Sequence, residues 1–353
     1  MDELHRGYRK ARKYLRLTAK AFELSDANFQ RLFGLTKPLV RLLIEDLTPH
    51  VRQADRNTKI PLNLKVLVAL NFYCSGSYQK RVGQDFLTCL SQASVSRIIR
   101  EISQLIAHNL LNKYITFPNT RASAERTKAG FQEKYGIYGV IGVIDGTHIR
   151  LSGLNRASAH SFFNRKRYYS LNVMMVCDSD CYISALNANF PGSAHDSHIW
   201  RMSDLNTYLE RKCYSSQNDT FLLGDKAYGL TPWLLTPLRG NLSRQEKAYN
   251  KWHRTARLSI ERTFGILKNR YRCLNGKERA LRYNPEIASY IVASCCVLHN
   301  LSVIASLPRV DATMYGNDSE IPDTANARMA MDVCSMGRIV QRRIVNMMNP
   351  HLE

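Results

Sequence analysis

Three acidic residues of this chain, Asp145, Asp225 and Glu261, have the side-chain type and the sequence context to bind divalent cations. Asp145 follows residues 138–144, a nearly unbroken run of apolar and glycine residues that predicts a buried strand with the acid at its end. A buried carboxylate costs free energy unless it pairs, accepts hydrogen bonds or binds a metal. Asp225 ends a second apolar run, residues 221–224. Acids at the ends of two parallel strands share the crevice that such strand ends form.

The third acid, Glu261, belongs to a helix predicted over residues 255–274. An apolar stripe should pack this helix on the sheet, and Glu261 lies at the edge of the stripe, where it can lean into the same crevice. The stripe consists of Ile260, Phe264, Leu267, Tyr271 and Leu274. The helical face of Glu261 also carries the cations Arg254, Arg257, Lys268 and Arg272. An acid within a row of cations suits a metal-holding carboxylate whose substrate is a polyanion, so we expect these four cations to contact DNA.

Carboxylates without an accompanying Cys or His cluster favour hard ions with oxygen ligands, which here means Mg²⁺ or Mn²⁺. Two such ions about 3.5–4 Å apart can activate a water or a 3′-hydroxyl and stabilise the leaving oxygen of a phosphodiester. Each acid alone also has a structural interpretation: a turn residue for Asp145, a strand-end cap for Asp225 and an ion-pair partner for Glu261. The three together, each on the expected kind of element, favour a metal site.

The charge of the chain indicates a polyanionic partner. Its 353 residues have a formal net charge of +21 and a sequence pI near 9.7. Residues 1–20 hold seven Lys and Arg against two acids, residues 150–172 hold five against none, and residues 244–282 hold twelve against three. Clustered cations suit a phosphate backbone or an acidic membrane surface. We favour double-stranded DNA, with Arg165 and Lys166 of the second cluster as further candidate contacts.

Cysteine usage and hydropathy bear on the compartment. The nine cysteines form no CxxC motif, which predicts reduced thiols in an intracellular protein without zinc. The longest apolar stretch, residues 290–305, is too short to span a bilayer and predicts a buried helix, so we expect no membrane partner. The basic residues 6–16 favour the nucleus, with the cytoplasm as an alternative, although a solvated helix explains the same charge.

Residues 61–115 predict a DNA-binding region of the helix-turn-helix kind, preceded by a basic helical segment over residues 1–60. Helices are expected over residues 62–76, 78–87 and 92–111, with Ser91 as the N-cap of the last. A recognition helix contacts DNA with its N-terminal residues. The polar residues in that position are Gln92, Ser94, Ser96, Arg97 and Arg100. An ordinary three-helix bundle fits the same pattern.

The remaining chain predicts an α/β domain, a mixed sheet flanked by helices. Residues 116–137 are expected to be a linker, residues 138–306 this α/β domain, and residues 307–353 a mobile segment with a C-terminal helix. Within the domain we expect a strand pair over residues 168–177 and 181–190, buried on both faces and turning at residues 178–180. Helices are expected over residues 198–211, 285–306 and 326–348.

Several motifs together resemble the DDE nuclease domain of PIF/Harbinger transposases and of Harbinger transposase-derived nucleases. They are GVIDGTHI at 142–149, NRK at 164–166, SLNV at 170–173, PGSAHDS at 191–197, LLGD at 222–225, IERTFGILK at 260–268 and CVLHN at 296–300. The likeness extends to the helical N-terminal region and so covers most of the chain. It implies an RNase H-like fold with Asp145, Asp225 and Glu261 as the catalytic, metal-binding triad. The 36-residue spacing from Asp225 to Glu261 agrees with the family pattern.

Asp196 is the competing second acid. It opens a predicted helix, where an aspartate is more often a cap or a structural partner, so we favour Asp225. The neighbouring His195 is either a satisfied structural histidine or a residue that orients a neighbour or contacts DNA. The chain departs from the family at two places where glycine is common, Arg167 and Ala227. Neither is an acid of the triad, so the departures concern loop geometry.

Three functions follow from these observations. The first is a transposase or transposase-derived endonuclease that cuts DNA with two divalent ions at a DDE triad. The second is a domesticated DNA-binding or adaptor protein without transposition activity. The third is a ribonuclease acting on RNA–DNA hybrids, which the fold also permits. The resemblance implies a Myb-like DNA-binding partner protein, and cutting two transposon ends implies a homo-oligomer, a dimer or higher.

Overall fold

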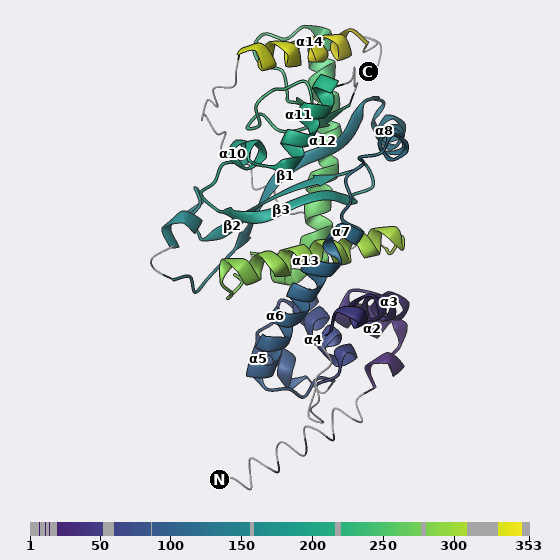
Figure 1. The fold of residues 1–353 in the computed structure, drawn as a ribbon, viewed down its shortest axis with the longest axis vertical. Coiled ribbons are helices and arrows are strands. Elements are labelled where there is room, and N and C mark those ends of the chain that lie inside the picture. The colour runs from purple at the N-terminus through teal and green to yellow at the C-terminus, as the bar shows by residue number, and fades with distance from the viewer. Residues whose placement is uncertain are drawn as a thin grey trace. The chain divides into compact units, whose positions relative to one another are not determined.

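The computed structural model describes residues 20–51, 60–85, 87–155, 159–215, 220–276, 280–308 and 331–347, together with Gly7, Ala11 and Tyr14. Most of the basic segment 6–16 and the expected mobile segment from residue 309 to 330 lie outside the described residues. The chain divides into two compact units (Figure 1). The first unit comprises Met1–Tyr114, Ile149–Asn155 and Leu267–Val310, and the second comprises Ile115–His148, Arg156–Ile266 and Asp311–Glu353.

The described part of the first unit is helical. Its helices are α2 (Asp26–Phe33), α3 (Lys37–Leu47), α4 (Leu62–Ser75), α5 (Gln79–Gln84), α6 (Gln92–Asn109), α7 (Leu111–Tyr114) and α13 (Pro285–Ile304), with short 3₁₀ turns at Ala21–Glu23, Thr48–His50 and Arg272–Leu274. The three helices expected around Ser91 are present, and Ser91 caps α6 by accepting a hydrogen bond of 3.2 Å from the backbone N–H of Ser94. Val95 and Ile98 are buried on the inner face of α6, and Arg97 and Arg100 are exposed.

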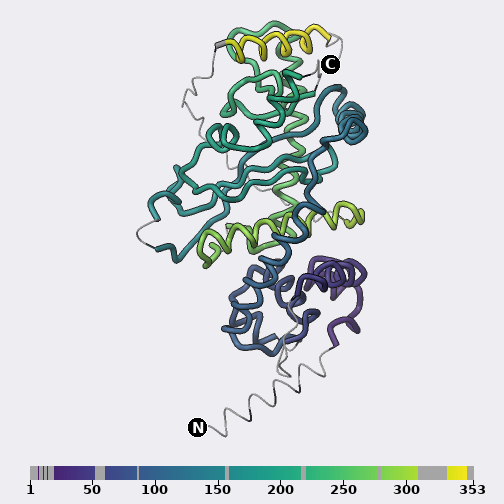
Figure 2. The backbone as a smooth tube through the Cα atoms, viewed as in Figure 1, coloured from purple at the N-terminus to yellow at the C-terminus, as the bar shows by residue number. Residues whose placement is uncertain are grey.

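The apolar helix α13 belongs to the first unit, although we expected it in a contiguous nuclease domain ending at residue 306. It is apolar on most faces and therefore needs partners on several sides. The hydroxyl of Ser294 donates to the carbonyl of Ser103 on α6 at 3.1 Å, and the amide of Asn300 donates to the carbonyl of Tyr114 at 2.7 Å. Figure 2 shows that α6 runs up to α13 in space within this unit. The expected domain was one contiguous stretch of sequence, whereas α13 packs against helices that are far from it in the sequence.

The length of α13 differs from the length expected from the apolar stretch. At 20 residues it is long and apolar enough to cross a membrane by length and composition, whereas the stretch at 290–305 suggested it was too short. Most of its residues are buried inside the unit, including His299 and Asn300. Burial by protein accounts for its apolar composition.

The second unit contains a five-stranded mixed sheet. Its strands are β1 (Val140–Arg150), β2 (Ser170–Cys177), β3 (Ile183–Pro191), β4 (Phe221–Leu223) and β5 (Leu234–Leu235). Their order is β3-β2-β1-β4-β5, with β2 antiparallel to β3 and β4 parallel to both β1 and β5. This is the RNase H-like α/β arrangement, as expected. The two-residue β5 was not expected, and β3 is partly exposed rather than buried on both faces.

The helices of the second unit are α8 (Arg121–Tyr135), α10 (Asp196–Arg201), α11 (Asp204–Ser215), α12 (Arg244–Arg270) and α14 (Met331–Met347). The expected linker at 116–137 is therefore largely the helix α8, which begins with a reciprocal cap between Thr120 and Ser123. The single helix expected over 198–211 is two helices, because the hydroxyl of Ser203 caps the second by accepting from the N–H of Asn206 at 3.2 Å.

Helix α12 begins eleven residues earlier than expected and ends at Arg270. Its start is a capping box that the apolar stripe could not reveal: the N–H of Ser243 donates to Glu246 at 2.8 Å, and the N–H of Glu246 donates back to Ser243 at 3.3 Å. The part of α12 in the second unit packs against the sheet, where the thiols of Cys177 and Cys181 face Ser259.

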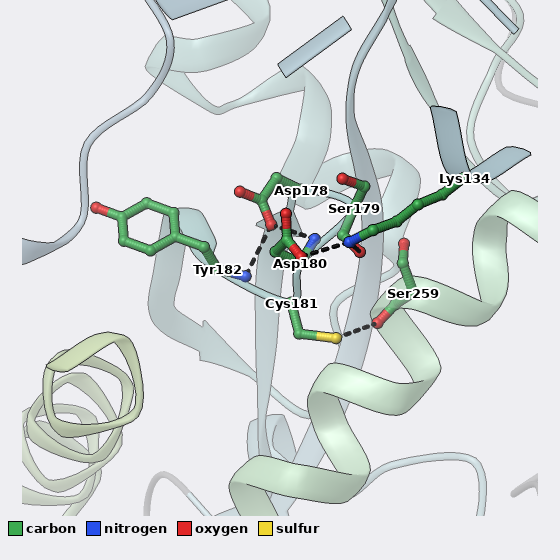
Figure 3. A network of polar contacts seen from close by, with 7 residues as sticks. All are labelled: Lys134, Asp178, Ser179, Asp180, Cys181, Tyr182 and Ser259. Atoms are coloured by element: carbon green, nitrogen blue, oxygen red, sulfur yellow. Dashed lines mark hydrogen bonds and ion pairs between the residues drawn. The ribbon is translucent and has the colours of Figure 1, made fainter. Parts of the chain in front are cut away.

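The turn between β2 and β3 connects the sheet to α8 and α12, as Figure 3 shows. The carboxylate of Asp178 accepts hydrogen bonds from the N–H groups of Asp180 and Tyr182 at 2.8 and 2.9 Å. Lys134 of α8 contacts the Asp180 carboxylate and donates to the carbonyl of Ser179 at 3.1 Å. The turn is thus attached to both α8 and α12, which fixes the edge of the sheet beside the helix that carries Glu261.

Buried His253 of α12 gives the second unit an acid sensitivity. Its Nε2 lies 3.2 Å from the carbonyl oxygen of Leu235 on β5, and burial lowers the pKa of His253 to about 4. The unfolded chain therefore binds a proton that the folded chain does not, once the pH falls below the ordinary histidine pKa. Stability from this residue is complete above that pKa and declines as the pH falls toward 4.

We expect His253→Gln to remove about 2 kcal/mol of the stability difference between pH 7.5 and pH 5. Urea unfolding followed by circular dichroism at both pH values measures the difference, with the exposed His108→Gln as the matched control. An unchanged pH dependence in His253→Gln would contradict the assignment.

Candidate active site

Asp145 lies in the middle of β1, and not at the end of a strand as expected. Residues 140–145 of this strand are all buried, and Asp145 is 7% exposed. One of its carboxylate oxygens, Oδ1, accepts a hydrogen bond of 2.9 Å from the N–H of Gly146. Its partner β4 is only three residues long, Phe221–Leu223, whereas β1 runs on past Asp145 to Arg150. The acid is therefore presented beside the end of the neighbouring strand.

The pairing of β1 with β4 brings Asp225 to the same level of the sheet. Val143 pairs with Leu223 in parallel register, so Asp145 and Asp225 each follow this pair by two residues. Asp225 begins a tight turn in which its Oδ1 accepts from the N–H of Ala227. Ala227 does not have a positive φ, so the turn accommodates alanine in place of the family's glycine without backbone strain. The register thus leads both acids toward one level of the sheet, and the charge of Asp225 contributes to the raised pKa of Asp145.

Arg257 of α12 supplies the positive charge next to these acids. Its Nη2 lies 2.5 Å from Oδ2 of Asp145, and both side chains are largely buried. We expected Arg257 to contact DNA. In the structure its face of α12 is turned into the sheet, and its guanidinium forms an ion pair with the buried Asp145. A helical wheel fixes which residues share a face but not what that face covers.

The electrostatics of the pair show which acids lie near it. Burial raises the pKa of Asp145 to about 7, Arg257 acts in the opposite direction, and Asp196 and Asp225 raise it further. Burial would lower the pKa of Arg257, but the charges of Asp145, Asp225 and Glu261 outweigh it, and the pKa lies above its ordinary value. All three acids of the expected triad thus act on one guanidinium.

Asp196 is closer to this centre than the sequence indicated. A Cβ added to Gly146 would lie 2.4 Å from Oδ1 of Asp196, so the carboxylate packs directly on the backbone next to Asp145. The amide of Asn172 on β2 holds Asp196 with a hydrogen bond of 2.7 Å. Asn172 is 3% exposed, and its own Oδ1 is buried without a hydrogen-bond partner. Asn172 was missed as a site residue, although a polar amide within the apolar run 170–177 was the available signal.

The acids fit hard divalent ions by their oxygen chemistry, and Arg257 marks a place where positive charge is stabilised. Across the described residues, however, no group of three or more His, Cys, Asp and Glu side chains is arranged to hold a metal ion. Glu261 is half-buried on α12, one turn after Arg257. An ion bound at Oδ2 of Asp145 would compete with Arg257 for this oxygen.

The segment with Arg165 and Lys166 lies beside the start of α10. The guanidinium of Arg165 lies 2.8 and 3.0 Å from the two ring nitrogens of His195, so these candidates meet. Arg165 is exposed and Lys166 half-buried. Arg167 has a φ of +62°, which explains why glycine suits this position in the family. Elsewhere Arg254 is exposed on α12, while Lys268 and Arg272 belong to the first unit.

The comparison with known proteins covers the region that contains these residues. The family model described as DDE superfamily endonuclease matches residues 144–300, a range that contains Asp145, Asp225 and Glu261. The human protein named "Putative nuclease HARBI1" is 34% identical over 305 residues, which cover 86% of this chain and 85% of the human protein. The Xenopus laevis protein of the same name is 31% identical, over 81% of this chain and 82% of its own. "Protein ALP1-like" of Arabidopsis thaliana is 26% identical over 80% and 69%. No solved structure matches.

Proposed function

The chain belongs to the Harbinger family of DDE transposases and transposase-derived nucleases, and from this premise we propose that it cleaves phosphodiester bonds of double-stranded DNA. Asp145, Asp225 and Glu261 would hold the divalent ions, Mg²⁺ or Mn²⁺. The observation that supports this most is the parallel register of β1 and β4, which brings the half-buried Asp225 toward the buried Asp145. A buried carboxylate with a second acid beside it costs free energy unless a cation accompanies them.

Bound divalent ions supply Lewis acidity at the scissile phosphate and lower the pKa of the attacking hydroxyl. The chain's own residues prepare that site. Arg257 pairs with Asp145 while no ion is bound and opposes the rise in the pKa of Asp145 that burial causes. Asn172 and Gly146 hold Asp196 beside it, so that Asp196 maintains a negative potential behind the ion ligands.

The released Arg257 would then lie one turn from Glu261 with its charge available for the DNA phosphate. Arg165, Lys166 and Arg254, together with Arg97 and Arg100 of α6, are the further cations proposed to contact the backbone. We also propose a dimer or higher oligomer, a nuclear location and a Myb-like partner protein. These follow from the family and from the charge of +21, which suits a nucleic-acid ligand.

The test is nicking of supercoiled duplex DNA by the purified protein. We expect nicking with Mg²⁺ or Mn²⁺, none with EDTA, and recovery when the ion is added back. Glu261→Gln should abolish it, whereas Glu133→Gln, the same change at an exposed residue of α8, should leave it intact. Equal nicking by wild type and Glu261→Gln would overturn the triad. An RNA–DNA hybrid offered in competition separates DNA cleavage from ribonuclease activity.

A DNA-binding or adaptor protein is the second candidate function. It is favoured by the ion pair of Arg257 with Asp145, which supplies the buried acid with a counter-charge from the chain itself. In that case the protein would bind duplex DNA with the same affinity in EDTA and in Mg²⁺, and no ion would cause nicking.

A further inference from the structure

A cavity of about 680 Å³ lies in the first unit, at the N-terminal end of α6. Residues from α4, α5, α6 and the segment 280–283 line it, among them Phe72, Tyr78, Gln79, Gln92, Arg282 and Tyr283. Gln92 is the first residue of α6, whose outer face carries the exposed Arg97 and Arg100. The cavity therefore lies at the end of α6 that would contact DNA.

The walls of this cavity are aromatic. Phe72 and Tyr283 meet edge to face with ring centroids 5.9 Å apart and are both buried. Tyr78, in contrast, is 52% exposed, and the guanidinium of Arg282 lies 5.6 Å from its ring centroid. An aromatic ring with a cation over it and half of its surface accessible is a surface on which a planar base can stack.

The polar groups of the cavity include amides, hydroxyls and cations. The side-chain amide of Gln79 donates to the hydroxyl of Tyr283 at 2.7 Å, and burial raises the pKa of Tyr283, so this phenol stays neutral. Gln92 and Lys80 are exposed at the rim. The lining that the structure describes contains Lys80 and Arg282 but no Asp or Glu. Its charge thus complements a phosphate, and its amides can form hydrogen bonds with the edge of a base.

The loop beneath Tyr78 is held in place. Gly76 ends α4 with a φ of +60°, and an added Cβ would lie 3.0 Å from the carbonyl oxygen of Arg272. The backbone that leads to Tyr78 therefore packs closely on the 3₁₀ turn Arg272–Leu274. A ring carried on a fixed backbone loses little freedom when a ligand stacks on it.

We propose that this cavity binds one unstacked nucleotide of the DNA that α6 contacts, with the base on Tyr78 and its phosphate between Lys80 and Arg282. The inference rests on the proposed function, because DNA must be the ligand of α6. An acidic peptide would satisfy the two cations but would not need the exposed ring or the amides, so the lining favours the nucleotide. The protein would thus favour DNA in which a base has left the stack.

The test compares two duplexes of equal length, one fully paired and one with a single unpaired 2-aminopurine, in buffer without divalent ions. Affinity is measured by fluorescence anisotropy, and stacking by quenching of 2-aminopurine. Wild type should bind the unpaired duplex more tightly and quench its fluorescence. Tyr78→Ala should bind it about 10-fold more weakly, without the quenching, and bind the paired duplex within about 2-fold of wild type.

Tyr138→Ala is the matched control. Tyr138 is 49% exposed, and the ammonium of Lys128 lies 5.0 Å from its ring centroid, but it belongs to the second unit. It should change neither affinity. Arg282→Gln should reproduce the loss seen with Tyr78→Ala, and thermal unfolding of each variant checks that the fold is retained.

Three results would overturn the proposal: Tyr78→Ala binding both duplexes like wild type, equal losses on both duplexes, or displacement of the unpaired duplex by an acidic peptide from wild type but not from Tyr78→Ala. Failure of wild type to bind either duplex would overturn DNA binding by α6 as well. If 2-aminopurine is quenched while supercoiled DNA is not nicked, the cavity assignment stands and only the nuclease proposal fails.

Discussion

Asp225→Asn is expected to lower the rate of Mg²⁺-dependent nicking by about 10³-fold or more, because the variant loses several kcal/mol of transition-state stabilisation by a bound ion. Asp196→Asn should lower the nicking rate by only about 10- to 100-fold, as is usual for a residue that contacts the metal ligands without binding the ion itself. Asp225 follows the β1–β4 pair in register with Asp145, whereas Asp196 is engaged by Asn172 on β2.

Single-turnover nicking at saturating Mg²⁺ measures both effects, with Mn²⁺ titration as a second readout of ion affinity. Glu133→Gln serves again as the exposed control. If Asp196→Asn were as inactive as Asp225→Asn and lost Mn²⁺ affinity to the same extent, Asp196 would be a ligand. The assignment of the second acid of the triad to Asp225 alone would then be wrong for this chain.

Replacing Arg257 should have the second largest effect, on stability. Arg257→Gln leaves the buried Asp145 without its counter-charge, which in buried pairs costs about 3–5 kcal/mol. The cost is limited here because burial has already raised the pKa of Asp145 to about 7, so the acid can take up a proton instead. We therefore expect a clear drop in the midpoint of thermal unfolding in EDTA, larger at pH 8 than at pH 6.

The same variant should bind ions more tightly, because the guanidinium no longer competes for Asp145. Calorimetric titration should show about a tenfold gain in Mn²⁺ affinity, equivalent to about 1.4 kcal/mol, and Mn²⁺ should restore much of the lost thermal stability. Arg257→Lys keeps a charge at the position and Arg262→Gln changes an exposed arginine of the same helix, and both should resemble wild type. Arg257→Gln that is destabilised but gains no affinity would show that Arg257 does not occupy the place of an ion.

Local signals were sufficient for most of the fold. The apolar run before Asp145 identified β1, and Ser91 marked the start of α6, because strands and helix caps depend on residues close in sequence. Capping by Ser203 and the capping box at Ser243 were also local, but each was hidden within polar segments where an apolar pattern gives no guidance. The assignment of α13 to the first unit depends on contacts with distant helices, which periodicity does not record.

The candidate site was predictable in part for a similar reason. The apolar runs before Asp145 and Asp225 predicted neighbouring parallel strands, and β1 and β4 pair in parallel, although Asp145 lies within β1 and not at its end. The direction in which α12 turns Arg257 could not be predicted, because a face with both cations and apolar residues has two possible orientations. The proximity of Asp196 to Asp145 was equally hidden, since it depends on Gly146 having no side chain.

That last contact has a consequence for related genes. The carboxylate of Asp196 fills the volume that a Cβ on residue 146 would need, and the nearest approach would be 2.4 Å. The two positions should therefore change together: a relative with alanine or serine at 146 should carry a smaller residue at 196. Relatives that keep both residues should retain the same close packing, and a genetic screen that begins from Gly146→Ala should recover second-site suppressors at codon 196.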